Sequence, residues 1–327
     1  MSIKKVEIDK DISMILKFDL EQTPRQSIRH YWLKIISDGL GSPICVPVMV
    51  ARGKKDFPIL GLTAAVHGNE LNGIPVIQRL FNEIDVRELK GTIVGIPVVN
   101  IPSFTRKKRR FNDGVDLNHI MPGKVDGNVS EVYAHRFIER LVKHFDYLLD
   151  LHTASFGRIN SYYIRADMKH PITRKLALLQ NAQIIVHNPP SDGTLRGTAE
   201  SMDIPAITLE VGNPNTFQKK LIRSGVEGIH NVLSYLEMTE DEIEQPEKEA
   251  VICKRSYWIY TDTGGLLTIP VNLTDHVKKG DLIASLRDVF GNLSREYFAP
   301  EDGVVIGKSI SPVNQSGGRI LHLGVLK

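Results

Sequence analysis

Between about residues 56 and 236, short apolar runs alternate with amphipathic segments, which predicts an α/β domain. Segments 72–84 and 130–145 repeat apolar residues at the helical period, and Ser130 is the expected N-cap of the second helix. Apolar strands joined by crossover helices are typical of a mixed, largely parallel sheet flanked by helices. The predicted strands are residues 58–66 (PILGLTAAV), 91–100, 146–152, 183–187 and 205–211.

The composition changes after residue 236. The stretch EMTEDEIEQPEKEA is strongly acidic and contains Pro246, so we expect a solvated linker there. Residues 251–327 consist of short β-type segments punctuated by glycine, without a helical period. We therefore divide the chain into a catalytic domain, residues 1–245, and an all-β module, residues 246–327.

Composition excludes several classes of protein. Hydrophobic residues make up 42% and charged residues 24% of the chain, which is ordinary for a globular protein. Cys45 and Cys253 stand alone, outside any CxxC motif, which argues against a disulfide framework or a thiolate zinc site. Charges scattered through the first twenty residues argue against a signal peptide, and no apolar run reaches membrane-spanning length. We expect a cytoplasmic protein with no membrane partner.

The chain carries little excess charge. Its formal net charge is only +3, too small to predict a polyanionic partner. The basic run at residues 106–110 (RKKRR) contains no aromatic residue of the kind that stacks on single-stranded nucleic acid. We interpret the run as a loop at the rim of the active site, where it would attract an anionic substrate, and we expect no nucleic-acid partner.

Potential metal ligands lie where predicted strands end. His67 and Glu70 follow the strand at residues 58–66, His152 ends another strand, and Glu210 lies near the end of a third. Ligands of open α/β sheets bind at the carboxyl ends of the strands, and two histidines with one glutamate leave a zinc position open. Gly68 is expected to let the backbone turn so that His67 and Glu70 face one point. Taken singly, these residues would fit a helix cap or a buried histidine, but their joint placement favours a metal site.

The chain resembles the succinylglutamate desuccinylase/aspartoacylase family of the zinc carboxypeptidase superfamily. The segments that carry this resemblance follow in the family's order: AAVHGNELNG, PVVNIPSF, RRFNDGVDLN, DLHTASFGR and IPAITLEVG. The closing segments GGLL, VKKGDLIASL and PEDGVV look like a biotinyl/lipoyl-type β-sandwich. The turn that would present a modified lysine, residues 288–292, contains none, so we expect an unmodified module that serves as a lid, an oligomer contact or a gate.

The resemblance implies roles for individual residues. His67, Glu70 and His152 match the ligands of one zinc ion, and Glu210 matches the catalytic carboxylate. The remaining matches are Asp116, which orients a ligand imidazole, Arg110, which polarises the scissile carbonyl, and Asn118, which binds the substrate carboxylate. Zinc makes bound water acidic, and a free glutamate passes the proton to the leaving nitrogen. The expected reaction is hydrolysis of an N-acyl amino acid or a similar N-acyl amine.

One position departs from the family pattern. The family continues DLN with an arginine that pairs with a substrate carboxylate, but this chain has His119. A histidine cannot form the bidentate fork of a guanidinium. Either carboxylate recognition is weaker, or Arg196 or Arg158 supplies it, or the substrate lacks that carboxylate. Arg196, which lies shortly before the strand that carries Glu210, is the expected substitute.

Two other functions fit the same residues. A metallo-carboxypeptidase or peptide amidase would use the same chemistry, and cobalt or nickel would suit the same ligands as zinc. A binding protein with a degenerate site is the alternative outside enzymology, although such a protein would have no need of Glu210 or Arg110. The sequence leaves the acyl group, the amine and homo-oligomer formation open.

Overall fold

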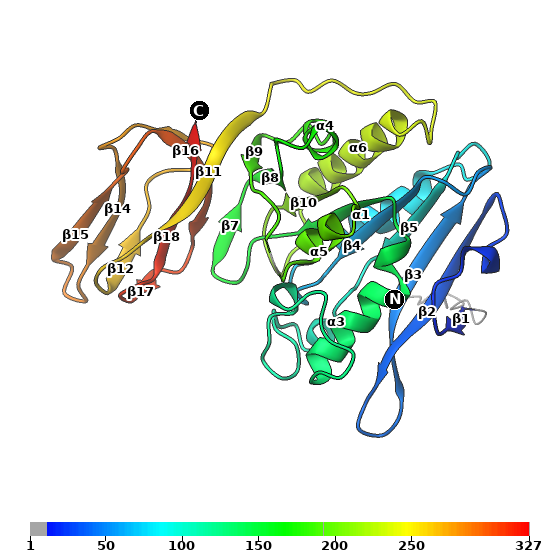
Figure 1. The fold of residues 1–327 in the computed structure, drawn as a ribbon. Coiled ribbons are helices and arrows are strands. Elements are labelled where there is room, and N and C mark those ends of the chain that lie inside the picture. Colours follow the sequence, from blue (N-terminus) through cyan, green and yellow to red (C-terminus); the bar gives the residue numbers. More distant parts are fainter. Residues whose placement is uncertain (1–11, 192, 327) are drawn as a thin grey trace, which may run out of the picture.

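The centre of the fold is a group of buried strands that coincide with the predicted apolar runs, except for the strand at Tyr162–Ala166, which was not predicted (Figure 1). The computed structural model describes residues 12–191 and 193–326. The central strands are β4 (Ile59–Ala64), β5 (Thr92–Ile96), β6 (Tyr147–His152), β8 (Tyr162–Ala166), β9 (Ile184–His187) and β10 (Ala206–Val211). Strands β5, β4, β6 and β10 are parallel neighbours, whereas β8 runs antiparallel to β10. This confirms the expected mixed, largely parallel sheet.

Three further strands extend one edge of the sheet, in a region for which the sequence makes no detailed prediction. They are β1 (Ser13–Ile15), β2 (Ser27–Ser37) and β3 (Pro43–Arg52). Strand β2 is antiparallel to β3, and β3 is antiparallel to β5. Residues 1–11, part of the segment in which we expect no signal peptide, lie outside the described residues.

Helices cover both faces of the central strands. Helices α1 (Gly73–Glu83), α4 (Pro171–Leu178) and α6 (Lys219–Tyr235) contribute to one hydrophobic cluster. Helices α3 (Val129–Arg140) and α5 (Leu195–Ser201) contribute to the cluster on the opposite face. The remaining helical segments are short: α2 (Ile101–Thr105) and the 3₁₀ turns η1 (Leu20–Gln22), η2 (Leu117–His119) and η3 (Val142–His144).

The start of α3 differs from the prediction. Its N-cap is Asn128, whose side chain accepts from the backbone N–H of Glu131 while the Glu131 carboxylate accepts from the N–H of Asn128. Ser130 lies in the first turn and donates its hydroxyl to Asn128. The reciprocal pair satisfies two amide groups at the helix end, which Ser130 alone would not do.

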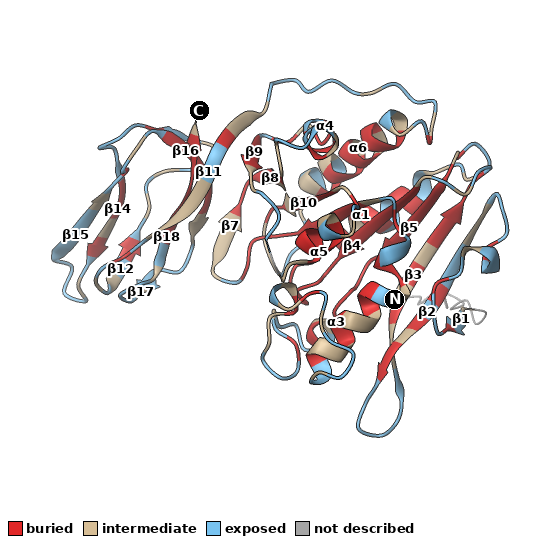
Figure 2. Cartoon of the chain, in the orientation of Figure 1, coloured by how far each residue is buried: buried red, intermediate tan, exposed pale blue. Residues whose placement is uncertain are grey.

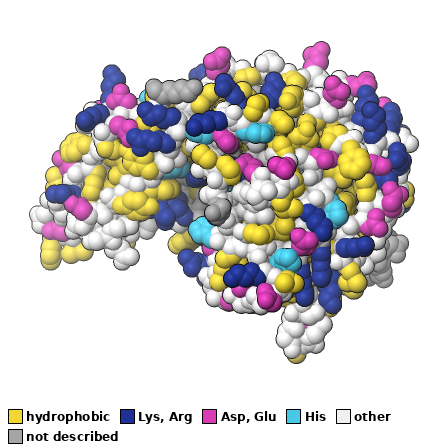
Figure 3. All heavy atoms as spheres, in the orientation of Figure 1, with side chains coloured by type: hydrophobic (Ala, Val, Ile, Leu, Met, Phe, Trp, Pro, Cys, Tyr) yellow, Lys and Arg dark blue, Asp and Glu magenta, His cyan; other side chains and the backbone are white. Residues whose placement is uncertain are grey.

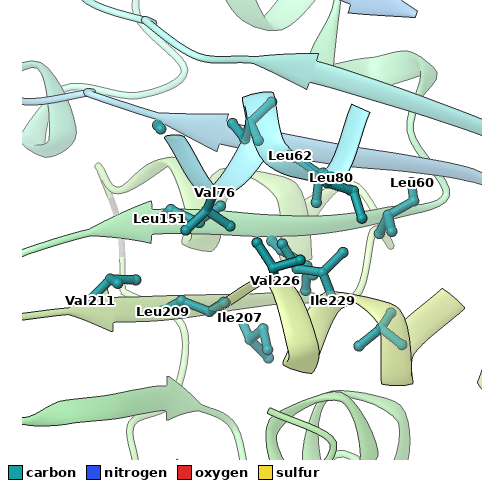
Figure 4. Close-up of a cluster of buried hydrophobic side chains, with 14 of the residues drawn as sticks. Leu60, Leu62, Val76, Leu80, Leu151, Ile207, Leu209, Val211, Val226 and Ile229 are labelled. Carbon is teal, nitrogen blue, oxygen red and sulfur yellow. The ribbon is translucent and has the colours of Figure 1, made fainter. Parts of the chain in front are cut away.

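Alternate residues of each central strand enter different clusters. Leu60 belongs to the cluster under α1 and α6, whereas its neighbour Ile59 belongs to the cluster under α3 and α5. Figure 4 shows side chains from β4, α1 and α6 pointing toward one another in the first cluster. Because both faces are covered, the strands are apolar on both sides, which explains their continuous hydrophobic runs. Figure 2 shows the same strands as the most buried part of the chain.

All described regular elements after residue 250 are strands, as the sequence predicts. They are β11 (Val251–Tyr260), β12 (Gly265–Thr268), β13 (His276–Val277), β14 (Leu282–Arg287), β15 (Leu293–Phe298), β16 (Gly303–Ser309), β17 (Val313–Asn314) and β18 (Arg319–Leu326). Strands β15, β14, β12 and β17 form a separate four-stranded sheet. The acidic segment before β11 contains no helix or strand, although Met238 within it is buried.

The carboxyl-terminal strands are joined to the α/β part through the main sheet. Strand β11 pairs in parallel with β9, so the central sheet continues into β11, β18, β16 and β13. A second junction pairs β7 (Arg158–Asn160) with β16. Two separate sets of backbone hydrogen bonds therefore fix the position of the module relative to the central strands.

Other features of the described chain agree with its composition. Cys45 and Cys253 are free thiols. None of the described helices combines the length and hydrophobicity needed to cross a membrane. On the face drawn in Figure 3, basic and acidic side chains are interspersed.

We expect Leu80→Ala to lower the free energy of unfolding by about 2–5 kcal/mol, because it opens a cavity between the sheet and two helices. Leu80 is fully buried in the cluster shown in Figure 4. Urea denaturation followed by circular dichroism measures the change. The control is Arg79→Ala on the same helix, where the side chain is 48% exposed and the expected change is about 0.5 kcal/mol or less. Equal losses in the two variants would contradict the assignment of the core.

Candidate metal centre and active site

Three neighbouring parallel strands bring the predicted ligands and the predicted catalytic carboxylate to one edge of the sheet. In the pairing of β10 with β6, Glu210 is opposite His152. In the pairing of β4 with β6, Ala64 is opposite Leu151, so the segment carrying His67 and Glu70 leaves the sheet beside His152. The strand register therefore places all four residues at the same end of the sheet.

His67, Glu70 and His152 form a buried group that is suited to hold a metal ion. One ligand atom from each residue lies within 4.8 Å of the others. The Nδ1 atom of His67 is 2.9 Å from Oε1 of Glu70, and Nδ1 of His152 is 2.9 Å from Oε2 of the same carboxylate. The side chains of the three residues are at most 5% exposed. Two imidazoles and one carboxylate are the donor set of many zinc sites that keep an open position.

The Nδ1 atom of His67 gives a direct sign that a ligand belongs in this group. This buried nitrogen has no hydrogen-bond partner among the described residues, since it and the nearby Glu70 oxygen are not aligned for a hydrogen bond. Buried polar atoms are rarely left without a partner. A cation between the nitrogen and the carboxylate satisfies both, so the residues fit a metal ion.

Each imidazole is oriented from behind by an aspartate. The Nε2 atom of His67 is 2.9 Å from Oδ1 of Asp116, the residue that the family resemblance implies for this position. The Nε2 atom of His152 is 2.8 Å from Oδ2 of Asp150, a contact the sequence analysis missed. An aspartate that accepts the Nε2 proton leaves Nδ1 free to bind a metal. The sequence did contain a signal for this contact. Asp150 and His152 are two residues apart on one strand, so their side chains point to the same face of the sheet.

Glu70 and His152 shift each other's pKa. Burial opposes charge on the Glu70 carboxylate, but His67 and His152 outweigh this effect and hold its pKa well below the usual range. Burial likewise opposes charge on His152, but Asp150 and Glu70 raise the pKa of that imidazole. The surroundings thus favour a negative Glu70 with positive charge next to it, and a cation bound to neutral imidazoles would supply that charge in place of the proton on His152.

Gly68 is needed for a different reason from the one we expected. Its φ angle is not positive, but a Cβ atom at this position would lie 2.2 Å from the backbone nitrogen of Phe104. The residue with the left-handed backbone is Ala65, at φ 51°. Gly68 therefore permits the HGNE loop to pack against the backbone of α2 at Ser103 and Phe104, and this contact holds the ligand loop in place.

Glu210 is held away from the ligand group by its own partners. Its Oε2 atom accepts a hydrogen bond from the Asn160 amide at 3.3 Å, and its Oε1 atom is 3.5 Å from Nε of Arg165. Burial raises the pKa of Glu210, against the lowering by Arg165 and His152. Glu210 thus stays outside the metal group while lining the same cavity, which has a volume of about 550 Å³.

The structure brings Arg109 rather than the predicted Arg110 to the metal group. The guanidinium of Arg109 donates to Oε1 of Glu70 at 2.7 Å, to Oδ2 of Asp116 at 3.0 Å and to the hydroxyl of Ser155. Arg110 also lines the cavity, but it is exposed and donates to the carbonyl oxygen of Gly114 at 3.0 Å. The two arginines are adjacent in a basic run, so the spacing of the motif alone could not show which of them reaches the metal group.

The predicted substrate-binding residues also line the cavity. The side-chain oxygen of Asn118 accepts the backbone N–H of Leu195 at 2.7 Å, which leaves its amide nitrogen to donate. His119 is exposed at the rim. Arg196 is buried and already engaged, with Glu200 at 3.2 Å and Asn188 at 2.8 Å.

The carboxyl-terminal strands contribute a wall of the cavity that the sequence analysis missed. Trp258, Arg319 and His322 line it together with Arg158. These residues come from β11, β18 and β7, which meet through sheet pairings. No local motif indicates such contacts, because they join residues far apart in the chain.

Comparison with known proteins identifies the family. The family model described as the succinylglutamate desuccinylase/aspartoacylase catalytic domain matches residues 56–236. The chain belongs to this family. The matched range contains the whole metal group and Glu210, so the resemblance inferred from the motifs is confirmed.

Among curated relatives of this family member, N-alpha-acetyl-L-2,4-diaminobutyric acid deacetylase of Halomonas elongata is 26% identical over 297 residues, which cover 86% of each chain. Succinylglutamate desuccinylase of Pseudomonas paraeruginosa is 30% identical over 180 residues, which cover 50% of this chain and 54% of that protein. The chain thus matches only about half of the length of the desuccinylase. The deacylase names confirm the expected class of enzyme, a hydrolase of amide bonds.

Solved structures agree on the fold. The product-bound ectoine utilization protein EutE (DoeB) of Ruegeria pomeroyi is 23% identical with a TM-score of 0.84, over 92% of this chain and 96% of that one. A succinylglutamate desuccinylase of Silicibacter sp. TM1040 is also 23% identical, with a TM-score of 0.83 over 95% and 97%. The family fold therefore extends through the carboxyl-terminal strands as well as the matched catalytic domain.

We expect Asp150→Asn to weaken metal binding by about 10- to 100-fold, because the amide no longer fixes the imidazole of His152 as the carboxylate does. Competition with a chromophoric chelator measures the metal affinity directly. Asp146→Asn, before the opposite end of the same strand, is the matched control, since that carboxylate accepts the backbone N–H of Ile59. An unchanged affinity in Asp150→Asn would remove Asp150 from the support of the metal ligand.

Proposed function

We propose that the protein is a zinc-dependent amidohydrolase that removes the acyl group from an N-acyl amino acid or a similar N-acyl amine. The observation that carries this proposal is the buried group of His67, Glu70 and His152, with Glu210 beside it in the same cavity. Zinc in such a site acts as a Lewis acid and makes water acidic enough to lose a proton near neutral pH.

Glu210 is the proposed general base and acid. Its carboxylate is buried and is positioned by Asn160 and Arg165 without being part of the ligand group. Burial raises its pKa toward the range in which a carboxylate exchanges protons with water near neutral pH. It would take the proton from the attacking water and deliver it to the leaving nitrogen.

Arg109 is the proposed residue that stabilises the negative charge that develops on the scissile carbonyl. Its guanidinium is fixed by Glu70, Asp116 and Ser155 at the edge of the metal group. A donor held in place before reaction stabilises developing charge without reorganisation. Asn118 is proposed to donate its amide to a substrate carboxylate, since its oxygen is already occupied.

The division into two domains and the location in the cytoplasm are also proposed. We propose residues 1–245 as the catalytic domain and residues 246–327 as an unmodified β-sandwich of the biotinyl/lipoyl type. The turn at residues 288–292 is stabilised by Asp288, which accepts the backbone N–H groups of Phe290 and Asn292, and it offers no lysine for modification. The free thiols of Cys45 and Cys253 suit the reducing cytoplasm.

We expect Glu210→Gln to retain stoichiometric zinc and to lose activity by roughly 10²- to 10⁴-fold, because the amide cannot accept the water proton. Zinc content by plasma mass spectrometry and hydrolysis of N-acyl amino acids measure the two properties separately. Short peptides in the same assay test the carboxypeptidase or amidase alternative. Normal turnover in this variant would exclude Glu210 as the base.

We expect Arg109→Gln to lower kcat by about 10²- to 10³-fold, since one preorganised donor is removed. Arg110→Gln is the adjacent matched variant, and its loss should be much smaller because Arg110 is exposed. Steady-state kinetics of both variants, with zinc content measured in parallel, compare the two arginines. A larger loss in Arg110→Gln would restore the role that the family motif implies for Arg110.

A further inference from the structure

The loop that carries two of the metal ligands is not adjacent to the strand that carries Glu210. Strand β6 lies between β4 and β10, so the pairing of the sheet joins the two segments only through β6. A general base acts only within hydrogen-bond reach of the proton that it removes. The distance between the metal group and Glu210 therefore depends on any further contact that ties the ligand loop to the end of β10.

The first residues of two helices supply such a contact. Asn72 precedes α1 and Gln218 precedes α6, and neither side chain caps its own helix, although both helices pack on the same face of the sheet (Figure 4). Asparagine before a helix ordinarily binds the first amides of that helix. The Asn72 side chain instead accepts the backbone N–H of Gln218 at 2.9 Å. Its amide donates to Oε1 of Gln218 at 3.1 Å and to the carbonyl oxygen of Val211 at 2.7 Å.

The Gln218 side chain also closes the turn that follows Glu210. Its Oε1 atom accepts the backbone N–H of Asn213 at 2.6 Å in addition to the Asn72 amide. Gly212 leaves room for this contact, because a Cβ atom there would lie 2.4 Å from Oε1 of Gln218, and its backbone is left-handed at φ 79°. One acceptor oxygen thus holds both the turn and the ligand loop.

The turn leads back to the Glu210 carboxylate through Asn213. The Oδ1 atom of Asn213 accepts the backbone N–H of Asn160 at 3.3 Å, and the Asn160 amide donates to Glu210 at 3.3 Å. The turn contacts the ligand loop a second time, since the backbone N–H of Asn215 donates to the carbonyl oxygen of Asn69 at 2.9 Å. A continuous path of hydrogen bonds therefore connects the ligand loop with the carboxylate of Glu210.

We infer that Asn72 and Gln218 are positioning residues of the active site, which hold Glu210 at its working distance from the metal group. This inference rests on the proposed function, because it concerns the placement of the proposed base. Neither residue is among the described residues that line the cavity of the metal group, and both are uncharged. They act through the segments that they join. A displacement of about 1 Å between reacting groups can cost roughly 100-fold in rate.

The test compares two substitutions at Gln218 in the zinc-loaded protein. Gln218→Met keeps the length of the side chain but has no oxygen to accept the two hydrogen bonds, whereas Gln218→Glu keeps both acceptor contacts. We expect Gln218→Met to lower kcat by roughly 10- to 100-fold with little change in KM, and Gln218→Glu to retain most of the wild-type kcat. Equal losses in the two variants would overturn the role of the acceptor oxygen.

Gln180→Met is the matched control for a simple loss of stability. Gln180 is fully buried, and its amide donates to the carbonyl oxygens of Leu176 and Gly228 at 3.3 and 3.4 Å. This variant should lower the free energy of unfolding and leave kcat unchanged. If it lowers kcat as much as Gln218→Met does, the loss of activity reflects general destabilisation and the inference fails.

A double substitution shows whether Gln218 acts through Glu210. In the Glu210→Gln background, Gln218→Met should reduce the residual activity much less than it does in the wild-type protein, because the group that it positions is already inactive. Losses that multiply in the double variant would mean that Gln218 acts independently of Glu210, contrary to the inference.

Hydrogen exchange of the metal-free protein separates this inference from the proposed function. Gln218→Met should speed amide exchange in residues 67–73 as well as in residues 211–218, since the ligand loop loses its tie to the turn, and Gln218→Glu should change neither. If no N-acyl amine is hydrolysed, the proposed function fails, and the exchange measurement still decides whether Gln218 holds the ligand loop. If hydrolysis occurs but exchange in residues 67–73 is unchanged in Gln218→Met, only the positioning role is overturned.

Discussion

The structure depends on the burial of three ionisable side chains at the ends of parallel strands. Glu70, His67 and His152 are almost fully removed from water, and burial of an uncompensated charge is costly. Each group therefore requires partners, and the surrounding chain supplies them: Asp116 and Asp150 behind the imidazoles and Arg109 beside the carboxylate. The parallel register of β4, β6 and β10 makes this arrangement possible, because it brings segments far apart in sequence to one edge.

The sequence predicts the parts of this arrangement that follow from local pattern. Strands buried on both faces appear as continuous apolar runs, so β4, β6 and β10 were located with small errors at their ends. The metal group was predicted because ligands that follow successive parallel strands must meet at one edge. Local pattern was less reliable where neighbouring residues compete for the same role. Asn128 rather than Ser130 caps α3. Arg109 contacts Glu70, although the prediction named only its neighbour Arg110, as the residue that polarises the scissile carbonyl.

Sequence reasoning could not find the wall of the cavity formed by Trp258, Arg319 and His322. These residues belong to strands with ordinary alternating patterns, and their position depends on two pairings, β9 with β11 and β7 with β16. Strand pairing over such separations leaves no periodic signal in either segment. The residue types do not indicate this wall either. In the sequence, a tryptophan that contacts two arginines cannot be distinguished from one that is exposed.

The carboxyl-terminal module therefore lines the same cavity as the metal group. Its first strand continues the central sheet, so the backbone hydrogen bonds of the central strands extend directly into β11 and β18. Because this junction is paired through backbone hydrogen bonds at two places, it fixes Trp258, Arg319 and His322 beside the cavity that holds the metal group. The metal group and Glu210 come from the ends of the central strands, whereas Trp258, Arg319 and His322 reach the same cavity from the module. The cavity thus combines residues inside the range that the family model matches with residues outside it, and the family motifs can locate only the first set.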